Sequence, residues 1–356
     1  IRFYVKEITP DIELYGSPVN FDPENPLHPI SQPQDYAKEL AQTYGTFSTL
    51  GLPHDTWALE QDAFDEDAFL TQSGSIVRER EKIYIGELAN FKTGLFFGYF
   101  GMTDSISHMF FRHLNEPENK YHSTVFEAYK KADEIVGETR KLTKKDDVLI
   151  ILSDHGFKLF EYEVNLNTWL KENGYLVLKD NKREGAELLE DVDWTKTRAY
   201  AIGYNGIYLN LSGREKSGIV QKDEQATLQK ELRTKLLDLK NPFTSKAVIK
   251  KIYTRDDLGI TDTDTNAPDL SIGFYTGIRS SWDSAVGAVT KDVFAKRQSK
   301  WSGDHLFDAS EVPGVLLINQ KIDAKNPNIV DVIPTVLGFF NASMPNDIDG
   351  RNLLLK

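Results

Sequence analysis

Two features of the sequence predict an α/β fold with a largely parallel sheet. Apolar runs of strand length recur along the chain, among them TGLFFGYFGM at 93–102 and DDVLIILS at 146–153. Segments with charges at helical spacing lie between such runs. This alternation of strand and helix is typical of parallel strands that are joined by helices.

The segments before the first of these strands are predicted to be a helix, a loop and a second helix. PQDYAKELAQTYG at 33–45 has helical spacing and ends in glycine, a common helix stop. Residues 53–75 are acidic and irregular, which favours a mobile surface segment. Residues 76–91 again carry charges at helical spacing and lead into the strand at 93–102.

The middle of the chain continues the alternation. TDSISHMFFRHL, at 103–114, is predicted to begin a helix, and residues 121–142 form another. The run that ends in Asp154 and His155 has the strongest buried-strand character in the sequence. NLNTWLKENGYLVL, at 165–178, indicates a helix, a glycine stop and a strand.

The remaining elements fit an α/β core with one insertion. We predict a hairpin over 199–211, a charged helix near 220–240, strands at 268–275 and 313–319, and a helix packed on the sheet at 329–340. The expected domains are an N-terminal core part at 1–180, an inserted cap-like region at 181–245 and a C-terminal core part at 246–356.

Composition excludes several classes of function. The chain has 356 residues, a net charge of −12 and no cysteine, so thiolate chemistry and disulfides are excluded. An acidic surface repels nucleic acid and anionic lipid, and no apolar run reaches the roughly 20 residues that span a bilayer. A phosphorylated substrate would therefore need local cations, which bound metal ions can supply. The compartment is not fixed by these features.

Acidic and imidazole side chains follow the two central strands. Asp154 and His155 end one strand, and Asp104 comes just after the other. Ligands of open parallel sheets bind at the carboxyl ends of the strands. His108 lies four residues after Asp104, so both side chains share one face of a helical turn. A carboxylate and an imidazole at that spacing can bind one divalent cation.

His305 is the third element of this pattern. It follows Ser302, Gly303 and Asp304 in a predicted loop before the strand at 313–319. Taken one at a time, each of these groups has an ordinary structural interpretation as a cap, a surface pair or a hydrogen-bonded core histidine; together they favour a metal site. Ser153 lacks a nucleophile elbow around it and is interpreted as structural. The other histidines are predicted to be solvated surface residues: His28, His54, His113 and His122.

These motifs resemble those of the alkaline phosphatase superfamily. Asp104-x3-His108, the run Ser153–Asp154–His155–Gly156 and the run Gly303–Asp304–His305 occur in the order that this superfamily shows. The segments ELYGSPVNFDPENP, NLNTWL and IPTVLGFFNASMPNDIDGRNLL resemble its branch of phosphohydrolases and phosphomutases, which is similar to type I phosphodiesterases and nucleotide pyrophosphatases. The resemblance implies a three-layer α/β/α sandwich of the alkaline phosphatase type.

The resemblance also implies a set of metal ligands. Asp104, His108 and His305 would hold one divalent ion, and Asp154 and His155 would hold a second. Zinc or manganese is the metal expected at both positions. The implied activity is hydrolysis of a small phosphomonoester or phosphodiester by two-metal phosphoryl transfer.

One part of the superfamily pattern has no counterpart in this sequence. The resemblance implies a Ser or Thr nucleophile, and an Asp at the end of a first strand, both well before the D-x3-H motif. The stretch IRFYVKEITPDIELYG at 1–16 contains neither, and the first residue is Ile1. We therefore expect the nucleophile to lie upstream of this sequence, on an N-terminal segment that completes the site; without it the chain would be catalytically impaired.

Three alternatives remain open at this stage. A phosphomutase of the same superfamily would use the same ligands but would return the phosphoryl group within a closed site. Hydrolysis of a sulfate ester needs a modified upstream residue that this sequence does not include. A non-catalytic module that binds metal or a partner would be expected to have lost some of the five ligands.

Overall fold

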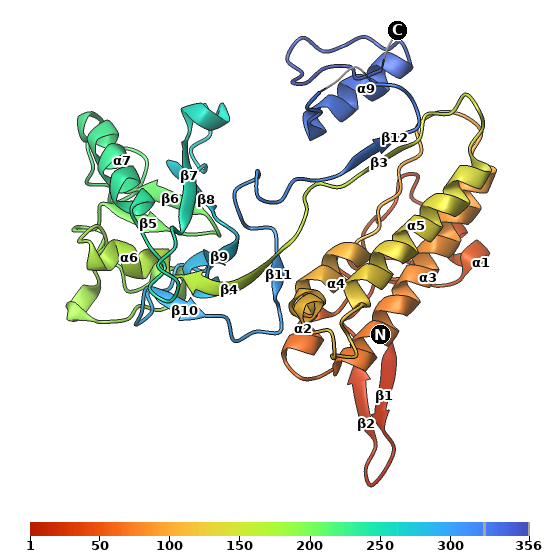
Figure 1. Ribbon diagram of the computed structural model, residues 1–356, viewed down its shortest axis with the longest axis horizontal. Coiled ribbons are helices and arrows are strands. Elements are labelled where there is room, and N and C mark those ends of the chain that lie inside the picture. Colours follow the sequence, from red (N-terminus) through yellow and green to blue (C-terminus); the bar gives the residue numbers. More distant parts are fainter. Residues whose placement is uncertain (262, 323–324, 355–356) are drawn as a thin grey trace. The chain divides into compact units, whose positions relative to one another are not determined.

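The computed structural model describes residues 1–261, 263–322 and 325–354 as a mixed α/β chain (Figure 1). Its contacts divide it into two compact units. Unit 1 comprises Ile1–Asp154, Ser299–Trp301 and Val315–Lys356, and unit 2 comprises His155–Gln298 and Ser302–Gly314. This division differs in kind from the functional domains predicted from the sequence. Those domains, two core parts at 1–180 and 246–356 and a cap-like region at 181–245, stay a prediction.

Unit 1 is mainly helical. Its elements are β1 (Phe3–Glu7), β2 (Glu13–Gly16), α1 (Tyr36–Tyr44), α2 (Thr56–Glu60), α3 (Glu66–Asn90), α4 (Met102–Phe110), the 3₁₀ helix η1 (Phe111–Asn115), α5 (Thr124–Leu142), β3 (Ile150–Leu152), β12 (Leu316–Ile318), η5 (Ile329–Asp331) and α9 (Val332–Phe339). Helices α3, α4 and α5 lie side by side (Figure 1). Buried Phe69, Met109, Phe110 and Ile135 belong to the core that these helices share.

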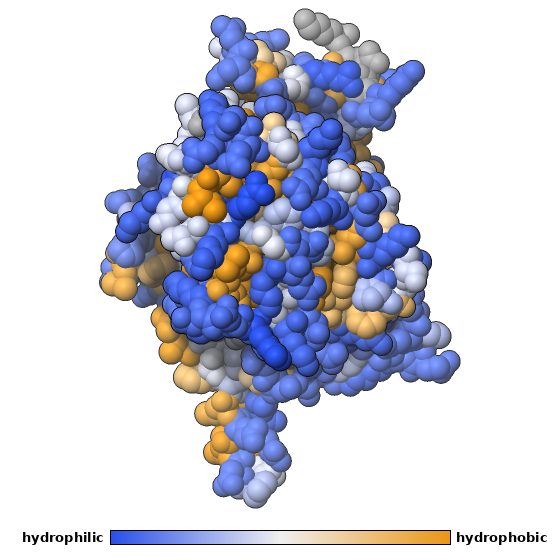
Figure 2. Space-filling model, turned by 90° about the vertical axis from the view of Figure 1, so that its left-hand side faces the viewer, coloured by the Kyte–Doolittle hydropathy of each residue, from blue (hydrophilic) through white to orange (hydrophobic). Residues whose placement is uncertain are grey.

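The antiparallel hairpin of β1 and β2 packs on this core through one face only. Tyr4 and Tyr15 contact the ring of Phe64, whereas Phe3, Val5 and Leu14 are more than half exposed. Figure 2 shows hydrophobic side chains along this hairpin, at the bottom of the view.

Unit 2 is built from two four-stranded sheets with helices beside them. Its elements are β4 (Lys158–Val164), α6 (Leu166–Glu172), η2 (Lys179–Asn181), η3 (Glu187–Leu189), β5 (Ala199–Ala201), β6 (Gly206–Leu209), α7 (Lys222–Leu237), β7 (Ile249–Thr254), η4 (Asp256–Leu258), β8 (Leu270–Phe274), β9 (Gly277–Ser280), α8 (Trp282–Ala285), β10 (Phe294–Lys296) and β11 (Gly303–Asp304). One sheet has the order β5-β6-β8-β7; in the other, β4 pairs with β9, β10 and β11.

Several predicted elements are confirmed. α1 ends before Gly45, α4 and α5 follow the predicted helices, and β5 with β6 forms the predicted hairpin. The charged helix is α7, whose Leu228, Leu232 and Leu236 are buried. Their spacing of four residues places them on one face. Helix α9 is also present at its predicted position, with Pro334 in its first turn.

The prediction of a loop over 53–75 is wrong. This segment holds α2 and the beginning of α3. Both helices begin at an aspartate cap: the Asp55 carboxylate accepts a hydrogen bond from the Ala58 amide at 2.9 Å, and Asp65 accepts one from Ala68 at 2.7 Å. Acidic residues favour a helix start because their carboxylates accept hydrogen bonds from the free amides there. Their negative charge also interacts favourably with the positive end of the helix dipole.

The largely parallel central sheet of the sequence prediction is not formed by the residues that the structure describes. Among their strand pairs, β4 with β9 is parallel and the others are antiparallel. The run at 93–100 forms no strand, and its Leu95, Phe97 and Tyr99 are more than half exposed. Apolar composition alone does not make a strand; the backbone also needs a neighbouring strand to bind its amides and carbonyls.

No helix in the described ranges has both the length and the apolar character needed to cross a bilayer.

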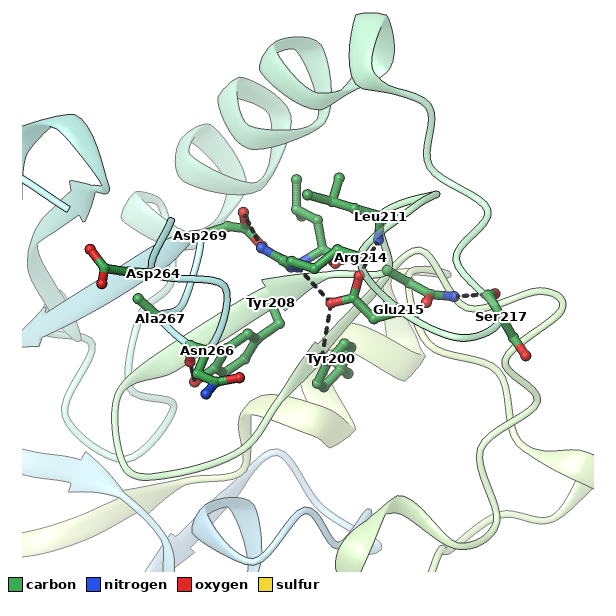
Figure 3. A network of polar contacts seen from close by, with 12 residues as sticks. Tyr200, Tyr208, Leu211, Arg214, Glu215, Ser217, Asp264, Asn266, Ala267 and Asp269 are labelled. Carbon is green, nitrogen blue, oxygen red and sulfur yellow. Dashed lines mark hydrogen bonds and ion pairs between the residues drawn. The ribbon is translucent and has the colours of Figure 1, made fainter. Parts of the chain in front are cut away.

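A buried polar network stabilises unit 2 (Figure 3). The guanidinium of Arg214 lies across the fully buried carboxylate of Asp269, with N···O distances of 3.1 and 2.7 Å, and its Nε donates to Glu215 at 2.8 Å. Asp269 also accepts a hydrogen bond from the Leu209 amide at 2.7 Å. The network therefore ties β6 to the start of β8.

We expect Asp269→Asn to lower the free energy of unfolding by about 3 kcal/mol, because the half-buried guanidinium of Arg214 would lose the fully buried one of its two carboxylate partners. Chemical denaturation would measure this difference. Lys196→Gln is the control, since it removes an ion pair with Asp193 whose lysine is largely exposed and should leave the unfolding midpoint nearly unchanged. Equal stability of Asp269→Asn and the wild type would contradict the role given to this network.

Candidate functional site

The helix α4 brings Asp104 and His108 together in unit 1. The helix begins after Gly101, so Asp104 lies in its first turn and His108 one turn later. The His108 Nε2 and Asp104 Oδ1 atoms are 3.6 Å apart. Two ligands at about 2.0–2.2 Å from one tetrahedral ion would be separated by about 3.4 Å, so this pair fits a shared divalent cation.

The imidazole of His108 is fixed by its surroundings. Its side chain is only 4 % exposed, and its ring stacks on Trp301 with a centroid distance of 3.7 Å. The Trp301 amide donates to the Glu60 carboxylate at 3.0 Å, and Arg112 donates to the carbonyl of Lys300. A ring held in this way needs little reordering to bind a metal.

Asp154 follows β3 in the same unit. β3 pairs with β12, and the Val315 amide donates to the hydroxyl oxygen of Ser153 at 2.9 Å; Ser153 therefore has the structural role predicted for it. Asp154 itself is exposed. Although Tyr99 is more than half exposed, partial desolvation raises its pKa, and the negative charges of Asp104 and Asp154 raise it further. Both carboxylates thus lie within electrostatic range of one hydroxyl.

His155 and His305 meet in unit 2. Their rings stack with a centroid distance of 3.6 Å and an interplanar angle of 18°. The chain directly after His155 lies close to another segment: a Cβ atom on Gly156 would lie 2.7 Å from the carbonyl oxygen of Pro313, so this position needs glycine. This stacking limits the movement of both imidazoles.

The loop that carries His305 is held by a buried ion pair. Oδ1 of Asp304 accepts hydrogen bonds from the amides of His305 and Leu306, at 2.7 and 3.1 Å. Its Oδ2 lies 2.9 Å from Nε of Arg279, an ion pair without the alignment of a hydrogen bond. Arg279 is fully buried, and its guanidinium lies over the ring of Phe160 at 4.3 Å.

No sequence motif pointed to Arg279. It lies 25 positions before its partner, in a strand whose sequence, GIRS, carries no recognisable motif. A charged residue within an otherwise apolar and small-residue strand was the only available signal, since such a residue is rarely buried without a partner.

Each predicted ligand therefore has a neighbour from the predicted set in its own unit. In unit 1, Asp104 and His108 form one group, and the charges of Asp104 and Asp154 both act on Tyr99. In unit 2, His155 and His305 form another group. The assignment of the five residues to a first and a second ion stays a prediction.

Two of the four histidines predicted to be surface residues are buried. His54 is 5 % exposed, and its Nδ1 lies 2.7 Å from the Ser73 hydroxyl; burial and the charge of Arg80 lower its pKa to about 4. His113 is 7 % exposed and pairs with Glu116. Helices α2 and α3 bury His54, and the sequence analysis had predicted a loop there. His28 is exposed, as predicted, and His122 is half-buried.

Comparison with known proteins identifies the family. The profile of the family described as type I phosphodiesterase / nucleotide pyrophosphatase matches residues 16–272, which is more than half of the chain. The protein belongs to this family. The match confirms the resemblance drawn from the motifs, and a search of curated proteins finds no significant match.

Four of the five predicted ligands lie within the part that matches the type I phosphodiesterase family: Asp104, His108, Asp154 and His155. His305 lies beyond residue 272, so its place in the site rests on the Gly303–Asp304–His305 motif and on its stacking with His155. The family is one of phosphoester hydrolases, and phosphoesters are its substrates.

Proposed function

We propose that this chain is a metal-dependent phosphoester hydrolase that acts on a small phosphomonoester or phosphodiester. The observation that carries the proposal is the family match across the segment that contains the Asp104–His108 pair and the Ser153–Gly156 motif. The stacking of His108 on Trp301 and of His155 on His305 supports it, because both contacts fix imidazoles in place.

The proposed cofactors are two divalent ions, zinc or manganese. Asp104, His108 and His305 would hold one, and Asp154 and His155 the other. The donor set of carboxylates and imidazoles suits either metal. When bound, such ions neutralise the charge of a phosphate and lower the pKa of a bound hydroxyl or water. The proposed architecture is the α/β/α sandwich of the alkaline phosphatase type.

The chain's own residues would supply binding and orientation. The carboxylates contribute negative charge that retains the cations, and the stacked imidazoles limit the movement of their ligand atoms. Rigid ligands matter because a small displacement of reacting groups costs a large factor in rate. The hydrolase is favoured over the phosphomutase because the matching family is one of phosphodiesterases.

Removal and return of metal tests the proposal. In a protein that includes the segment expected to carry the nucleophile, we expect chelation by EDTA, followed by its removal, to abolish hydrolysis of bis(p-nitrophenyl) phosphate and p-nitrophenyl phosphate. Zinc or manganese should restore it. Metal content measured by mass spectrometry should follow activity. Magnesium is the comparison ion, since it prefers oxygen ligands. Full activity after complete metal removal, or hydrolysis of an aryl sulfate alone, would refute the proposal.

A further inference from the structure

A small hollow in unit 1 adjoins Asp104 and contains a cationic side chain. It is lined by the segment 51–54, by Arg80 from α3, and by Tyr99, Gly101, Asp104 and Ser105 at the beginning of α4. A guanidinium and a predicted metal ligand therefore line the same depression. The family match and the motif analysis give Arg80 no role.

The side chain of Arg80 has no hydrogen-bond or ion-pair partner within the described ranges, although acids flank it in the sequence. The flanking Glu79 binds Arg2 at 2.5 Å, and Glu81 binds Lys131 at 2.9 Å. Both neighbouring carboxylates are thus already engaged. A half-buried guanidinium keeps five N–H donors in a planar arrangement that matches two oxygens of a phosphate.

The charge of Arg80 acts on the residues around the hollow. It contributes, after burial, to the lowered pKa of His54, and it opposes the effect of Asp104 and Asp154 on Tyr99. His54 is consequently neutral at physiological pH and adds no second cation. Among the residues that line the hollow, Arg80 thus supplies the positive charge. It lines the same space as Asp104, a predicted ligand of the metal.

The beginning of α4 gives a second reason to expect an anion here. Gly101 precedes the helix and offers no side chain to cap it. The first amides of a helix lack partners within the helix, and the helix dipole adds partial positive charge at this end. The beginning of α4 and Arg80 line the same hollow, so both contribute positive charge to its surroundings.

We propose that Arg80 binds the non-bridging oxygens of the substrate's phosphate group beside the metal ligand Asp104. The inference rests on the proposed function, which it deepens by assigning the residue that recognises the anion. Arg80 would act on binding and would hold no metal. An arginine suits this position because it pairs with two oxygens at once, which a lysine does not.

Calorimetric titration of the metal-loaded full chain with inorganic phosphate tests the assignment. We expect Arg80→Ala to weaken phosphate binding about 10- to 100-fold, the usual effect of losing a charge-assisted contact, and Arg80→Lys to give an intermediate loss. Metal content should stay at the wild-type level. In hydrolysis assays KM should rise more than kcat falls, because the contact is made to bound substrate as well as to the transition state.

Arg78→Ala is the matched control. Arg78 lies on the same helix, is exposed and lines no part of this hollow, so its removal changes the net charge equally. Unchanged phosphate affinity of Arg80→Ala, an equal loss in Arg78→Ala, or a wild type that binds no phosphate would overturn the assignment. If hydrolysis is absent in every protein while only Arg80→Ala loses phosphate affinity, the proposed reaction fails and the anion site stands.

Discussion

His108→Ala, made in a protein that includes the segment expected to carry the nucleophile, should lower kcat/KM for a phosphoester about a thousandfold or more, because losing a metal ligand removes several kcal/mol of charge stabilisation. The imidazole lies 3.6 Å from the Asp104 carboxylate and is fixed on Trp301, so the substitution removes a ligand that is already in position. Steady-state kinetics with bis(p-nitrophenyl) phosphate would measure the loss. Bound metal, counted by mass spectrometry, should fall in the same protein.

His28→Ala is the control for this experiment. His28 is exposed and contacts only the edge of Phe21 among the ring contacts that the structure describes. The variant should keep both its activity and its metal. His305→Ala should behave as His108→Ala does, since each residue is proposed to bind the same ion. A folded His108→Ala protein with wild-type turnover and metal content would show that this imidazole is structural.

Helices with strong local signals were predictable from the sequence. α1 has a glycine stop, and α7 has leucines at a spacing of four. The segment 53–75 was missed because its acids were interpreted as a solvated loop, whereas Asp55 and Asp65 are helix caps. The difference depends on a few hydrogen bonds within one turn, and composition over a window does not report them.

Strand pairing was less predictable than helix position. The runs at 93–102 and 146–153 have similar apolar character, yet only the second forms a strand, with β12 as its partner. The partner lies more than 160 positions later in the chain. Pairing over such distances depends on which backbone is next to which, and the residues of one segment do not specify this.

The candidate site shows the same division. Asp104 with His108, and Asp154 with His155, are close in sequence and were found from spacing. Arg279 and Arg80 carry no motif, and their roles depend on neighbours brought together by folding. Motif analysis therefore identified proposed ligands, whereas the residues that position a loop or face a hollow required the structure.

Breaking the ion pair between Arg279 and Asp304 should have the largest effect on stability. Asp304→Asn keeps an oxygen for the amides of His305 and Leu306 but leaves the guanidinium without its closest carboxylate. Losing one partner of a buried pair costs about 3–5 kcal/mol. Glu163, 3.4 Å from Arg279, is a more distant anion, and its pKa is already raised by burial. It would compensate only in part.

Denaturant unfolding and metal titration should separate the stabilising role of this pair from its role in holding His305. We expect Asp304→Asn to weaken metal binding about 10- to 100-fold, the usual effect of losing an outer contact of a ligand. Arg279→Met with Asp304→Leu should recover part of the stability, because two apolar side chains leave no buried charge between them. That double variant should not recover metal affinity, since no carboxylate orients the His305 loop.

The exposed pair of Lys120 and Asp67 provides the comparison for an ion pair in solvent. Lys120→Gln should leave the unfolding midpoint and the metal affinity close to those of the wild type, because solvent screens such pairs. If Asp304→Asn is as stable as Lys120→Gln, the buried pair contributes nothing to folding. If Asp304→Asn is less stable but binds metal as tightly as the wild type, Asp304 stabilises unit 2 without positioning His305.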